Sequence, residues 1–586
     1  MTLNTTNINS LWASLLIEEL NRHGVTQFVI SPGSRSTPLV VAVAEHPDAQ
    51  TVIHYDERGA AFFALGYARA TQRPAALICT SGTAVANYLP AVVEASVDCV
   101  PMILLTADRP PELRDTGANQ TITQPGIFAT YPRWQYDIPC PSADQPADFL
   151  LKIVDQAVGH AIGAPAGPVH LNCMYREPLA PVKTSEDLSG YFAGIESWSE
   201  SRTPYVARVQ MSSGIPEKDF GRVKDVVSSA RRGLLIAGGL KSESERRAVA
   251  ALAQQLNWPL IADIGSGLRG GEIRSRIDYY DLILSSSRFI DEHRPDSVLQ
   301  IGSRLASKRL LAFLEKTAPN RYVQVLDHPF RHDPIQRVTD RMQDDIELGC
   351  GQLLKAIPAQ QTTEWFNDWK KASQTVDAYL ERSFASATCM TEPLVAYLLS
   401  GELAEGSALW AASSMPIRDL DQFYDPRGRW IPVGCNRGAS GIDGTVASAA
   451  GYSLGTQKHV TLLIGDLAML HDLNSLALLK DDRIRMTVVV LNNNGGGIFG
   501  HLPIAGFDQM FEKYFVTPHG LNFAHAAKMF SLAYRHPTNA GQFVDQYRAV
   551  IRQPHSTLIE LTIDRSVNQQ FHFRIVTDIA ARLDGE

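Results

Sequence analysis

The sequence predicts an α/β protein of three domains, each with a mainly parallel sheet flanked by helices. Short, wholly apolar runs such as Val460 to Ile464 and Met486 to Leu491 are typical of strands buried on both faces of a sheet. Helical stretches separate these runs, as parallel strands require. The length of 586 residues suits three or four domains. We expect domains at residues 1–185, 205–358 and 375–586, with two similar α/β units on either side of a central one.

Composition and charge narrow the function classes. The chain is 45% hydrophobic and 20% charged, as in ordinary globular proteins, and its net charge of -8 argues against a general nucleic-acid or polyanion binder. Any anionic substrate must therefore meet local basic residues. The seven cysteines are scattered without a Cys-x-x-Cys pair, which argues against a disulfide framework and structural zinc. No signal peptide and no membrane-spanning run is visible, so we expect a cytoplasmic protein.

The first elements lead to a candidate anion site. Leu11 to His23 has helical periodicity, with Ser10 as the expected N-cap, and Gln27 to Ile30 reads as a strand. The loop that follows, Ser31 to Ser36, offers hydroxyl groups, backbone N–H donors and one arginine, Arg35. It is suited to holding an anion; the alternative is an ordinary turn with a solvated arginine.

A glutamate at the start of a helix is the next candidate. Thr51 to His54 reads as a strand, and the small and apolar residues from Gly59 onward predict a helix that packs closely against another surface. Glu57 lies at the start of that helix. It is either a capping residue favoured by the helix dipole or a functional carboxylate. Further strands are expected at Ala75–Thr80, Val100–Ala107 and Val169–Asn172, a helix from Ser81 to about Ser96, and a polar linker from Arg176 to Pro204.

The middle third has an α/β pattern of its own. Gly238-Gly239 and Gly265 to Gly267 follow two of its strands and could cradle a flavin nucleotide, but they do not form a full dinucleotide fingerprint. A structural domain without a cofactor is the favoured interpretation. Lys308 and Arg309 are either an exposed charge pair or part of a site. Strands are expected at Gly233–Ala237, Leu260–Ala262, Ser297–Ile301 and Tyr322–Val325.

The final third carries the strongest local pattern. After a polar helix at Glu364 to Ser383, one strand ends at Gly465-Asp466, a helix is expected at Leu470 to Leu479, and the next strand ends at the run Asn492 to Gly497. Both turns then lie at the carboxyl ends of neighbouring parallel strands, where open α/β sheets bind ligands. Asp466, Asn493 and a carbonyl near Gly495 suit a divalent cation that also carries a diphosphate. The alternative is a helix cap followed by a surface loop.

This arrangement resembles the diphosphate motif of thiamine-diphosphate enzymes, in which Gly-Asp-Gly precedes Asn-Asn by 25 to 30 residues, although Leu467 replaces the second glycine. Five segments in order narrow the resemblance to the 2-succinyl-5-enolpyruvyl-6-hydroxy-3-cyclohexene-1-carboxylate (SEPHCHC) synthase family, in which this leucine is usual. The resemblance spans about residues 10 to 565. The segments are Ser31–Ser36, Thr106–Leu113, Gly117–Gln120, Asn436–Gly444 and Gly465–Leu467.

The resemblance implies the architecture of the thiamine-diphosphate decarboxylases: a pyrimidine-binding domain, a central structural domain and a diphosphate-binding domain, in the order given above. It implies a homodimer or dimer of dimers with active sites at the subunit interface. The implied cofactors are thiamine diphosphate and Mg²⁺, with Mn²⁺ as an alternative. The implied reaction is decarboxylation of 2-oxoglutarate and 1,4-addition of the resulting succinyl semialdehyde carbanion to isochorismate, a transferase step of menaquinone biosynthesis.

The resemblance also implies roles for individual residues. The implied catalytic residues are Glu57, Arg35, Arg418, Arg437 and Ser414. The implied substrate-binding residues are Arg35, Arg109, Asn119, Gln120, Lys308, Arg309, Ser414, Arg418, Arg437, Ile498 and Phe499. The implied cofactor-binding residues are Glu57, Ser34, Gly82, Ile442, Gly441, Asp466, Leu467, Asn493, Gly495, Gly496 and Ile498. The implied metal ligands are Asp466, Asn493 and Gly495.

The implied chemistry accounts for these residue types. Glu57 would share a proton with the aminopyrimidine of the cofactor and so activate its C2 carbon. Arginine suits the four carboxylates of the two substrates because its planar fork binds carboxylate through two hydrogen bonds. Ile442 would support the bent shape of the cofactor, and Ile498 and Phe499 would form an apolar wall; for these three, plain core packing is the alternative.

Three other functions fit parts of the pattern. A simple 2-oxo-acid decarboxylase would release an aldehyde, but the several arginines favour a second anionic substrate. Acetolactate synthase in its common form would carry flavin. A non-catalytic cofactor-binding or assembly protein is the alternative from another class, and the presence of Glu57 argues against it.

Overall fold

The computed structural model describes residues 3–185, 187–208 and 217–585. It consists of two compact units. Unit 1 is Met1–Gln210 with the segments Asn436–Gln457 and His471–Ile484, and unit 2 is Met211–Cys435, Lys458–Leu470 and Arg485–Glu586. The described residues form three sheets, one in unit 1 and two in unit 2. Every strand pair among them is parallel, in line with the mainly parallel sheets that the sequence predicts.

The sheet of unit 1 has six strands in the order β2-β1-β3-β4-β6-β5. Its strands are β1 (Gln27–Ile30), β2 (Gln50–Ile53), β3 (Ala75–Cys79), β4 (Met102–Asp108), β5 (Trp134–Ile138) and β6 (Pro168–Met174). Its helical segments are α1 (Ile8–Arg22), α2 (Thr37–Glu45), α3 (Glu57–Thr71), α4 (Thr83–Ala86), α5 (Leu89–Val97), η1 (Pro111–Leu113), α6 (Ala147–Ile162), η2 (Ser189–Phe192), α7 (Glu196–Glu200), α17 (Thr445–Thr456) and η4 (Leu473–Lys480).

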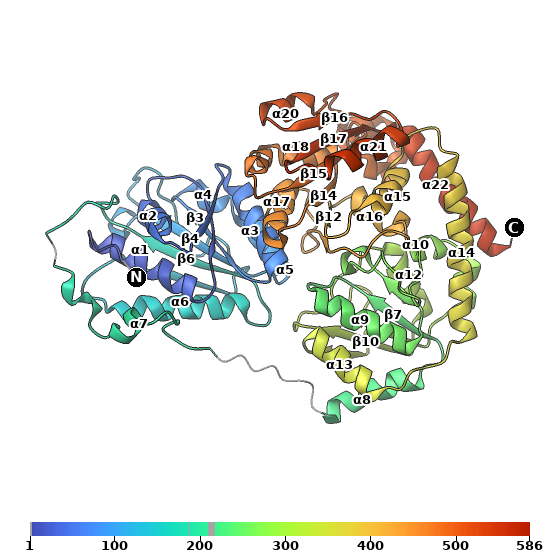
Figure 1. Ribbon diagram of the computed structural model, residues 1–586, viewed down its shortest axis with the longest axis horizontal. Coiled ribbons are helices and arrows are strands. Elements are labelled where there is room, and N and C mark those ends of the chain that lie inside the picture. Colours follow the sequence, from blue (N-terminus) through green and yellow to red (C-terminus); the bar gives the residue numbers. More distant parts are fainter. Residues whose placement is uncertain (1–2, 186, 209–216, 586) are drawn as a thin grey trace. The chain divides into compact units, whose positions relative to one another are not determined.

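Alternation along the strands places helices on both faces of this sheet. Phe28 and Ile30 of β1 pack in one core with the apolar faces of α1, α2 and α6. Helices α3 and α5 contact strands of the same sheet from its other face (Figure 1). Because both faces are covered, the central strands read as continuous apolar runs in the sequence.

The two sheets of unit 2 have the orders β11-β10-β9-β7-β8 and β13-β12-β14-β15-β17-β16. The strands are β7 (Gly233–Ala237), β8 (Leu260–Ala262), β9 (Ser297–Ile301), β10 (Arg321–Leu326), β11 (Asp340–Gln343), β12 (Ala408–Ala411), β13 (Val433–Gly434), β14 (Val460–Gly465), β15 (Met486–Asn492), β16 (Ala533–Arg535) and β17 (Thr557–Thr562). The helical segments are α8 (Glu217–Ser229), α9 (Glu243–Leu256), η3 (Ile264–Ser266), α10 (Tyr280–Ile283), α11 (Ser287–Glu292), α12 (Lys308–Thr317), α13 (Ile346–Ala356), α14 (Glu364–Ala385), α15 (Glu392–Glu402), α16 (Met415–Phe423), α18 (Asp466–His471), η5 (Gly497–His501), η6 (Pro503–Gly506), α19 (Asp508–Phe511), η7 (Glu512–Val516), α20 (Ala524–Met529), α21 (Ala540–Val550) and α22 (Arg565–Asp584).

One apolar core connects both sheets of unit 2. It contains Ile236 of β7 and Val489 of β15, together with residues of the long helices α14 and α22. A second core, on the other face of the first sheet, is built from α8, α9 and α13. This shared core explains why the two sheets form one compact unit.

Several local predictions need correction. The N-cap of α1 is Asn7, whose side chain accepts a hydrogen bond from the Ser10 backbone N–H, so Ser10 is not the cap. The helix expected from Ser81 to Ser96 is divided into α4 and α5, with Pro90 in the first turn of α5. The crossover between β14 and β15 is not one helix but α18 followed by the 3₁₀ segment η4.

Two further corrections concern segments outside the predicted elements. The expected polar linker from Arg176 to Pro204 contains η2 and α7, and Trp198 of α7 is buried. Edge strands β5 and β11 were not predicted. In β11 buried residues alternate with exposed ones, and in β5 partly exposed residues alternate with exposed ones before the buried Ile138. Neither strand therefore has the continuous apolar run of a central strand.

Glycines allow α3 and α17 to pack in close contact, side by side in Figure 1. A Cβ atom at Gly66 of α3 would lie 1.9 Å from the Ser448 carbonyl oxygen of α17, and one at Gly451 would lie 2.0 Å from the Phe63 carbonyl oxygen. These backbones approach too closely for any side chain. The predicted close packing of this small-residue helix is therefore confirmed, with α17 as its partner.

Replacing Gly66 by alanine should separate α3 from α17 and lower the free energy of unfolding by about 1–3 kcal/mol. Urea titration followed by circular dichroism would measure it. The matched control is Gly221→Ala in α8, where a Cβ atom meets nothing within 4 Å. That variant should be more stable by about 0.4–1 kcal/mol. Equal stability of the two variants would contradict the close-packing interpretation.

Candidate active site

In unit 1, the carboxyl ends of three adjacent strands bring predicted site residues to one edge of the sheet. The loop with Ser34 and Arg35 follows β1, the turn with Gly82 follows β3, and Arg109 follows β4; these strands are neighbours in the order β1-β3-β4. Ser34 is exposed and Arg35 is buried. This is the edge at which parallel sheets of α/β proteins bind ligands.

Arg35 and Arg109 place two positive charges close together. Arg35 is only 6% exposed, donates a hydrogen bond to the Tyr175 carbonyl oxygen at 3.0 Å, and lies 3.3 Å from a carboxylate oxygen of Glu177. Burial, and then the nearby charge of Arg109, lower the pKa of Arg35. The buried Nε of Arg109 has no hydrogen-bond partner among the described residues. A carboxylate between these two cations would relieve their repulsion.

The glycine turn after β3 is attached to the polar loop that carries Asn119 and Gln120. Gly82 has φ of +85°, and a Cβ atom there would lie 2.9 Å from the Gln120 side chain. Ser81 Oγ donates to the Gln120 carbonyl oxygen at 2.9 Å, and Gln120 Nε2 donates to the Ser81 carbonyl oxygen at 3.0 Å. Asn119 and Gln120 themselves are exposed.

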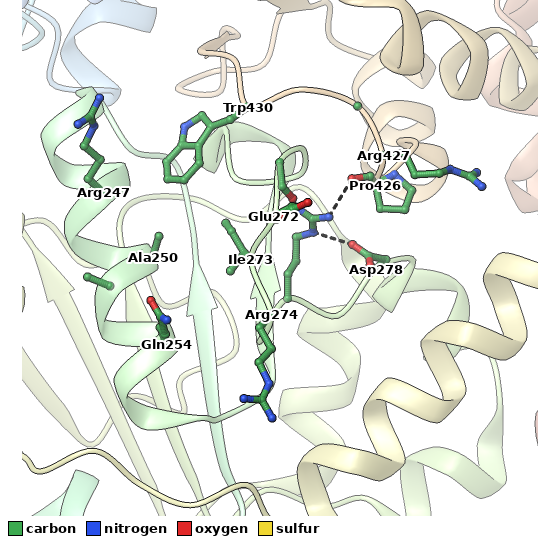
Figure 2. Close-up of a pocket in the computed structure, with 14 residues that line it drawn as sticks. Arg247, Ala250, Gln254, Glu272, Ile273, Arg274, Asp278, Pro426, Arg427 and Trp430 are labelled. Atoms are coloured by element: carbon green, nitrogen blue, oxygen red, sulfur yellow. Dashed lines mark hydrogen bonds and ion pairs between the residues drawn. The ribbon is translucent and has the colours of Figure 1, made fainter.

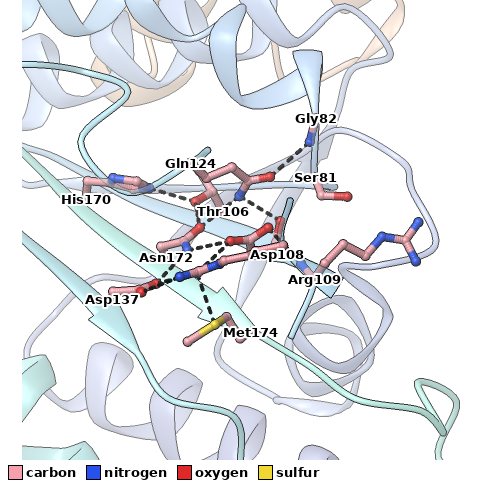
Figure 3. Close-up of polar contacts among 12 residues, drawn as sticks. Ser81, Gly82, Thr106, Asp108, Arg109, Gln124, Asp137, His170, Asn172 and Met174 are labelled. Atoms are coloured by element: carbon pink, nitrogen blue, oxygen red, sulfur yellow. Dashed lines mark hydrogen bonds and ion pairs between the residues drawn. The ribbon is translucent and has the colours of Figure 1, made fainter. Parts of the chain in front are cut away.

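A buried polar network lies beneath this edge (Figure 3). Gln124, fully buried, accepts a hydrogen bond from the Gly82 backbone N–H at 3.0 Å and donates to Asn172 Oδ1 at 2.8 Å. Asn172 in turn donates to Asp108, which also accepts from the Arg109 backbone N–H. Figure 3 shows the Arg109 side chain extending away from these contacts. The network links the glycine turn to Arg109. No local sequence pattern indicated Gln124.

Glu57 is not the N-cap of α3. The cap is Asp56, whose side chain accepts hydrogen bonds from the backbone N–H groups of Arg58 and Gly59. Glu57 is half-buried in the first helical turn, and its carboxylate lies 3.4 Å from the amide nitrogen of Asn87. Glu57 is therefore not the capping residue, although the first turn of α3 is a position where the helix dipole favours a carboxylate.

The loop that carries Arg437, Gly441 and Ile442 also belongs to unit 1. Glu94 of α5, 2% exposed, accepts hydrogen bonds from the backbone N–H groups of Gly438 and Ala439 at 2.7 and 2.6 Å. Burial raises the pKa of Glu94, followed by the charge of Asp98. The loop ends against α3, because a Cβ atom at Gly444 would overlap the Phe62 ring. Ile442 thus lies on a loop that is held by α5 and α3 of unit 1.

In unit 2, Asp466 is held in one orientation at the end of β14. Only 2% exposed, it accepts hydrogen bonds from the backbone N–H groups of Leu467 at 2.6 Å and Gly495 at 2.9 Å. His519 Nε2 lies 3.1 Å from Asp466 Oδ2. Since His519 Nδ1 accepts from the Leu521 backbone N–H, Nε2 faces Asp466 as a donor. His519 was not predicted to contribute to the site.

The three consecutive asparagines after β15 have different environments. Asn492 Oδ1 accepts from the Asn494 backbone N–H, and Asn494 Oδ1 accepts from the backbone N–H groups of His519 and Gly520. Asn493 Oδ1 is buried without a hydrogen-bond partner among the described residues. An oxygen that has lost its water and gained no donor is costly unless a ligand meets it. Of the three, Asn493 has the amide oxygen available for a cation.

Gly495 combines a special backbone conformation with close packing. Its φ is +135°, and a Cβ atom there would lie 2.2 Å from the Val516 carbonyl oxygen. Its own carbonyl oxygen accepts from the Gly497 N–H at 2.9 Å and keeps a second lone pair. A carboxylate, an amide oxygen and a carbonyl oxygen form the hard donor set that Mg²⁺ prefers, so these residues fit the metal. Gly496, also buried, follows directly.

The remaining predicted residues of unit 2 lie on three elements. Ser414 precedes α16 with φ of 76°, and Arg418 of the same helix donates to the Ser414 carbonyl oxygen. At the start of α12, Lys308 is exposed but Arg309 is only partly exposed, because it pairs with the buried Asp281. The purely solvent-exposed alternative is thus wrong for Arg309. Ile498 and Phe499 lie partly exposed on η5, which contradicts plain core packing.

A large pocket in unit 2, of about 1010 Å³, is formed by α9, the loop after β8 and the segment 426–430 (Figure 2). None of the described residues that line it is a predicted site residue. Three of the arginines that line it, Arg247, Arg276 and Arg427, pair with acidic neighbours. Arg276 pairs with Asp278 at 2.6 Å and donates to the Pro426 carbonyl oxygen; the dashed lines in Figure 2 end at the labelled Asp278 and Pro426. Pocket size therefore does not identify the candidate site.

All seven cysteines are free thiols, and in the described part of the chain the one cluster with metal-ligand geometry, Glu392, Asp419 and His572, contains none of them. Within residues 3–185, 187–208 and 217–585, no helix is both long and apolar enough to cross a membrane.

Comparison with protein families assigns all three parts of the chain. A family model described as the N-terminal TPP binding domain of thiamine pyrophosphate enzymes matches residues 12–127. A middle domain of thiamine pyrophosphate matches residues 189–410, and the C-terminal TPP binding domain of thiamine pyrophosphate enzymes matches residues 407–561.

Three similar curated relatives match over nearly the whole chain, and these three bear one name. The 2-succinyl-5-enolpyruvyl-6-hydroxy-3-cyclohexene-1-carboxylate synthase of Rubrobacter xylanophilus is 48% identical over 98% of this chain and 99% of its own length. That of Salinibacter ruber is 47% identical over 98% of both chains, and that of Prosthecochloris aestuarii is 41% identical over 99% of both.

Proposed function

We propose, from the premise that this chain belongs to the SEPHCHC synthase family of thiamine pyrophosphate enzymes, that it is a transferase of menaquinone biosynthesis. It would decarboxylate 2-oxoglutarate and add the resulting four-carbon unit to isochorismate. The observation that carries the proposal is the 48% identity over 98% of the chain to a synthase of this name. A simple 2-oxo-acid decarboxylase is not favoured, because the curated relatives described above share the synthase name.

The residues of unit 1 account for proton transfer and anion binding. Thiamine diphosphate, when bound, supplies a carbon nucleophile and accepts the electrons released by decarboxylation. Glu57 would hold a proton against the aminopyrimidine ring nitrogen, a role that its non-capping position allows. Arg35, Arg109 and Arg437 would bind substrate carboxylates. Ser34, Gly82, Gly441 and Ile442 would position the cofactor, and Asn119 and Gln120 would contact substrate.

The residues of unit 2 would bind the diphosphate group of the cofactor and its metal ion. Asp466, Asn493 and the Gly495 carbonyl would hold Mg²⁺, which neutralises the diphosphate charge. Gly496 and Leu467 would let backbone approach it. The other residues of unit 2 that would bind substrate are Ser414, Arg418, Lys308, Arg309, Ile498 and Phe499. We further propose domains at 1–185, 205–358 and 375–586, a cytoplasmic location, and a homodimer or dimer of dimers with active sites at subunit interfaces.

The direct test incubates purified protein with thiamine diphosphate, Mg²⁺, 2-oxoglutarate and isochorismate. We expect isochorismate absorbance to fall only when 2-oxoglutarate is present, with the succinyl adduct detected by mass spectrometry. Equal formation of carbon dioxide and succinic semialdehyde without isochorismate would refute the synthase function and favour the simple decarboxylase.

Replacing Arg109 by alanine should raise KM for one of the two substrates by about tenfold or more, since a charge-assisted hydrogen bond contributes about 1.5–3 kcal/mol. Steady-state kinetics with each substrate varied in turn would measure it. The matched control is Arg114→Ala, because Arg114 pairs with Asp108 and Asp137 in the same network. It should lower the melting temperature more than Arg109→Ala while changing KM less. The reverse pattern would exclude Arg109 from substrate binding.

A further inference from the structure

We propose that Glu392, a residue about one hundred positions before the asparagine run, is the positioning residue that orients Asn493 toward the metal ion. This inference rests on the proposed function only in taking Asn493 as a metal ligand. It assigns a role to a buried carboxylate that neither the motif nor the family resemblance singled out. Glu392 begins α15 and is 2% exposed.

The contact that carries the inference is a hydrogen bond of 2.7 Å from Asn493 Nδ2 to Glu392 Oε1. An asparagine amide has one donor end and one acceptor end, so a bond that fixes the nitrogen also fixes the direction of the oxygen. The oxygen of Asn493 is the end without a hydrogen-bond partner among the described residues. Because Glu392 Oε1 accepts from the amide nitrogen, this hydrogen bond directs the amide oxygen of Asn493 away from Glu392.

A neighbouring pair provides the internal comparison. Asn492 Nδ2 donates to Glu560 Oε1, also at 2.7 Å, and Glu560 is 1% exposed. The two asparagines are adjacent, and each is held through its nitrogen by a buried glutamate. They differ at the oxygen: that of Asn492 accepts a backbone N–H, whereas that of Asn493 does not meet a donor among the described residues. Of these two pairs, only Glu392–Asn493 leaves an amide oxygen that has no donor among the described residues.

Glu392 also has a backbone contact that fixes its position at the start of α15. Its backbone N–H donates to Asn568 Oδ1 at 2.8 Å. Ligand atoms of Glu392, Asp419 and His572 all lie within 4.8 Å of one another, and His572 Nε2 is 3.3 Å from Asp419 Oδ1. All three side chains are buried. The backbone of Glu392 is thus held by α22, as partners of metal ligands commonly are held, while its Oε2 atom has no hydrogen-bond partner among the described residues.

The experiment measures Mn²⁺ affinity by electron paramagnetic resonance of the free ion, with full-length protein and saturating thiamine diphosphate but without substrate. Glu392→Met removes the acceptor at similar side-chain length, and we expect the Mn²⁺ dissociation constant to rise about 10–100-fold. Glu392→Gln keeps an acceptor oxygen, so this conservative variant should raise the Mn²⁺ dissociation constant less, by about 2–10-fold. Glu560→Met and Glu560→Gln are the matched controls and should leave Mn²⁺ affinity within about twofold.

Each outcome of this experiment either supports or overturns the positioning role of Glu392. If the Glu392 and Glu560 variants weaken Mn²⁺ binding equally, or neither does, Glu392 does not position the ligand. If Glu392→Met does not fold, the two glutamine variants decide, and Glu392→Gln must bind Mn²⁺ more weakly than Glu560→Gln. Loss of all Mn²⁺ binding in His572→Ala would place the ion in the Glu392–Asp419–His572 cluster and overturn the inference. The Mn²⁺ titration contains no substrate. Its result therefore does not depend on whether the protein shows synthase activity.

Discussion

Glu57→Gln is expected to lower kcat about 10²–10⁴-fold, the range that a positioned acid–base group contributes. Glutamine has the same shape but cannot hold or release the proton that the aminopyrimidine ring nitrogen must share. Loss of a helix cap would not explain such an effect, because Asp56 rather than Glu57 caps α3. Thiamine diphosphate affinity, measured by quenching of tryptophan fluorescence, should change by less than about threefold, since one neutral hydrogen bond replaces another.

The control for this prediction is Asp56→Ala. Loss of the cap should reduce stability by about 0.5–2 kcal/mol while leaving kcat near the wild-type value. If Glu57→Gln retained wild-type turnover, the proposed role of Glu57 would be excluded. If both variants lost turnover equally, the effect would belong to the start of the helix and not to the carboxylate.

Asp466→Asn is expected to weaken Mg²⁺ binding by at least about 100-fold, because residues that only orient a metal ligand already contribute 10–100-fold. The asparagine fits the same space but removes the negative charge. It also places an NH₂ group where Asp466 now accepts from Leu467, Gly495 or His519. Thiamine diphosphate affinity should fall in parallel, since the diphosphate is held through the metal. Isothermal titration with Mg²⁺ and with cofactor would measure both.

Asp472→Asn is the matched control in the same crossover. Asp472 is 1% exposed and accepts hydrogen bonds from the Ala447 backbone N–H and Ser475 Oγ, so it has a structural role. Burial raises the pKa of Asp472 to about 6. Its neutral replacement should leave Mg²⁺ affinity near the wild-type value. Unchanged Mg²⁺ affinity in Asp466→Asn would remove Asp466 from the proposed metal site.

Most central strands could be predicted from the sequence because burial on both faces leaves a local trace. The bounds of β1, β7 and β9 agree with prediction, and those of β14 differ by one residue. The edge strand β5 could not be found in this way, since its partly exposed residues interrupt the apolar run. The divided helix α4–α5 shows a similar limit: Pro90 marks a helix start as readily as a break, and the sequence does not say which.

The candidate site was predictable where its residues follow strands directly. Asp466 and Asn493 stand at strand ends, and motif spacing identifies them. Their supporting residues could not be predicted, because Glu392 and His519 reach the site only through the fold and carry no local signal. The same holds for Glu94, which holds a loop more than three hundred residues later in the chain.

The discontinuous make-up of unit 1 has a consequence during protein synthesis. The six-stranded sheet can form once β6 has left the ribosome, but α17, the partner of α3, is translated only after the long helix α14 and the strands β7 to β11. At about 5–20 residues per second, that delay is on the order of tens of seconds. Throughout it, the small-residue face of α3 is uncovered on a nascent chain, and chaperones or neighbouring nascent chains can reach it first.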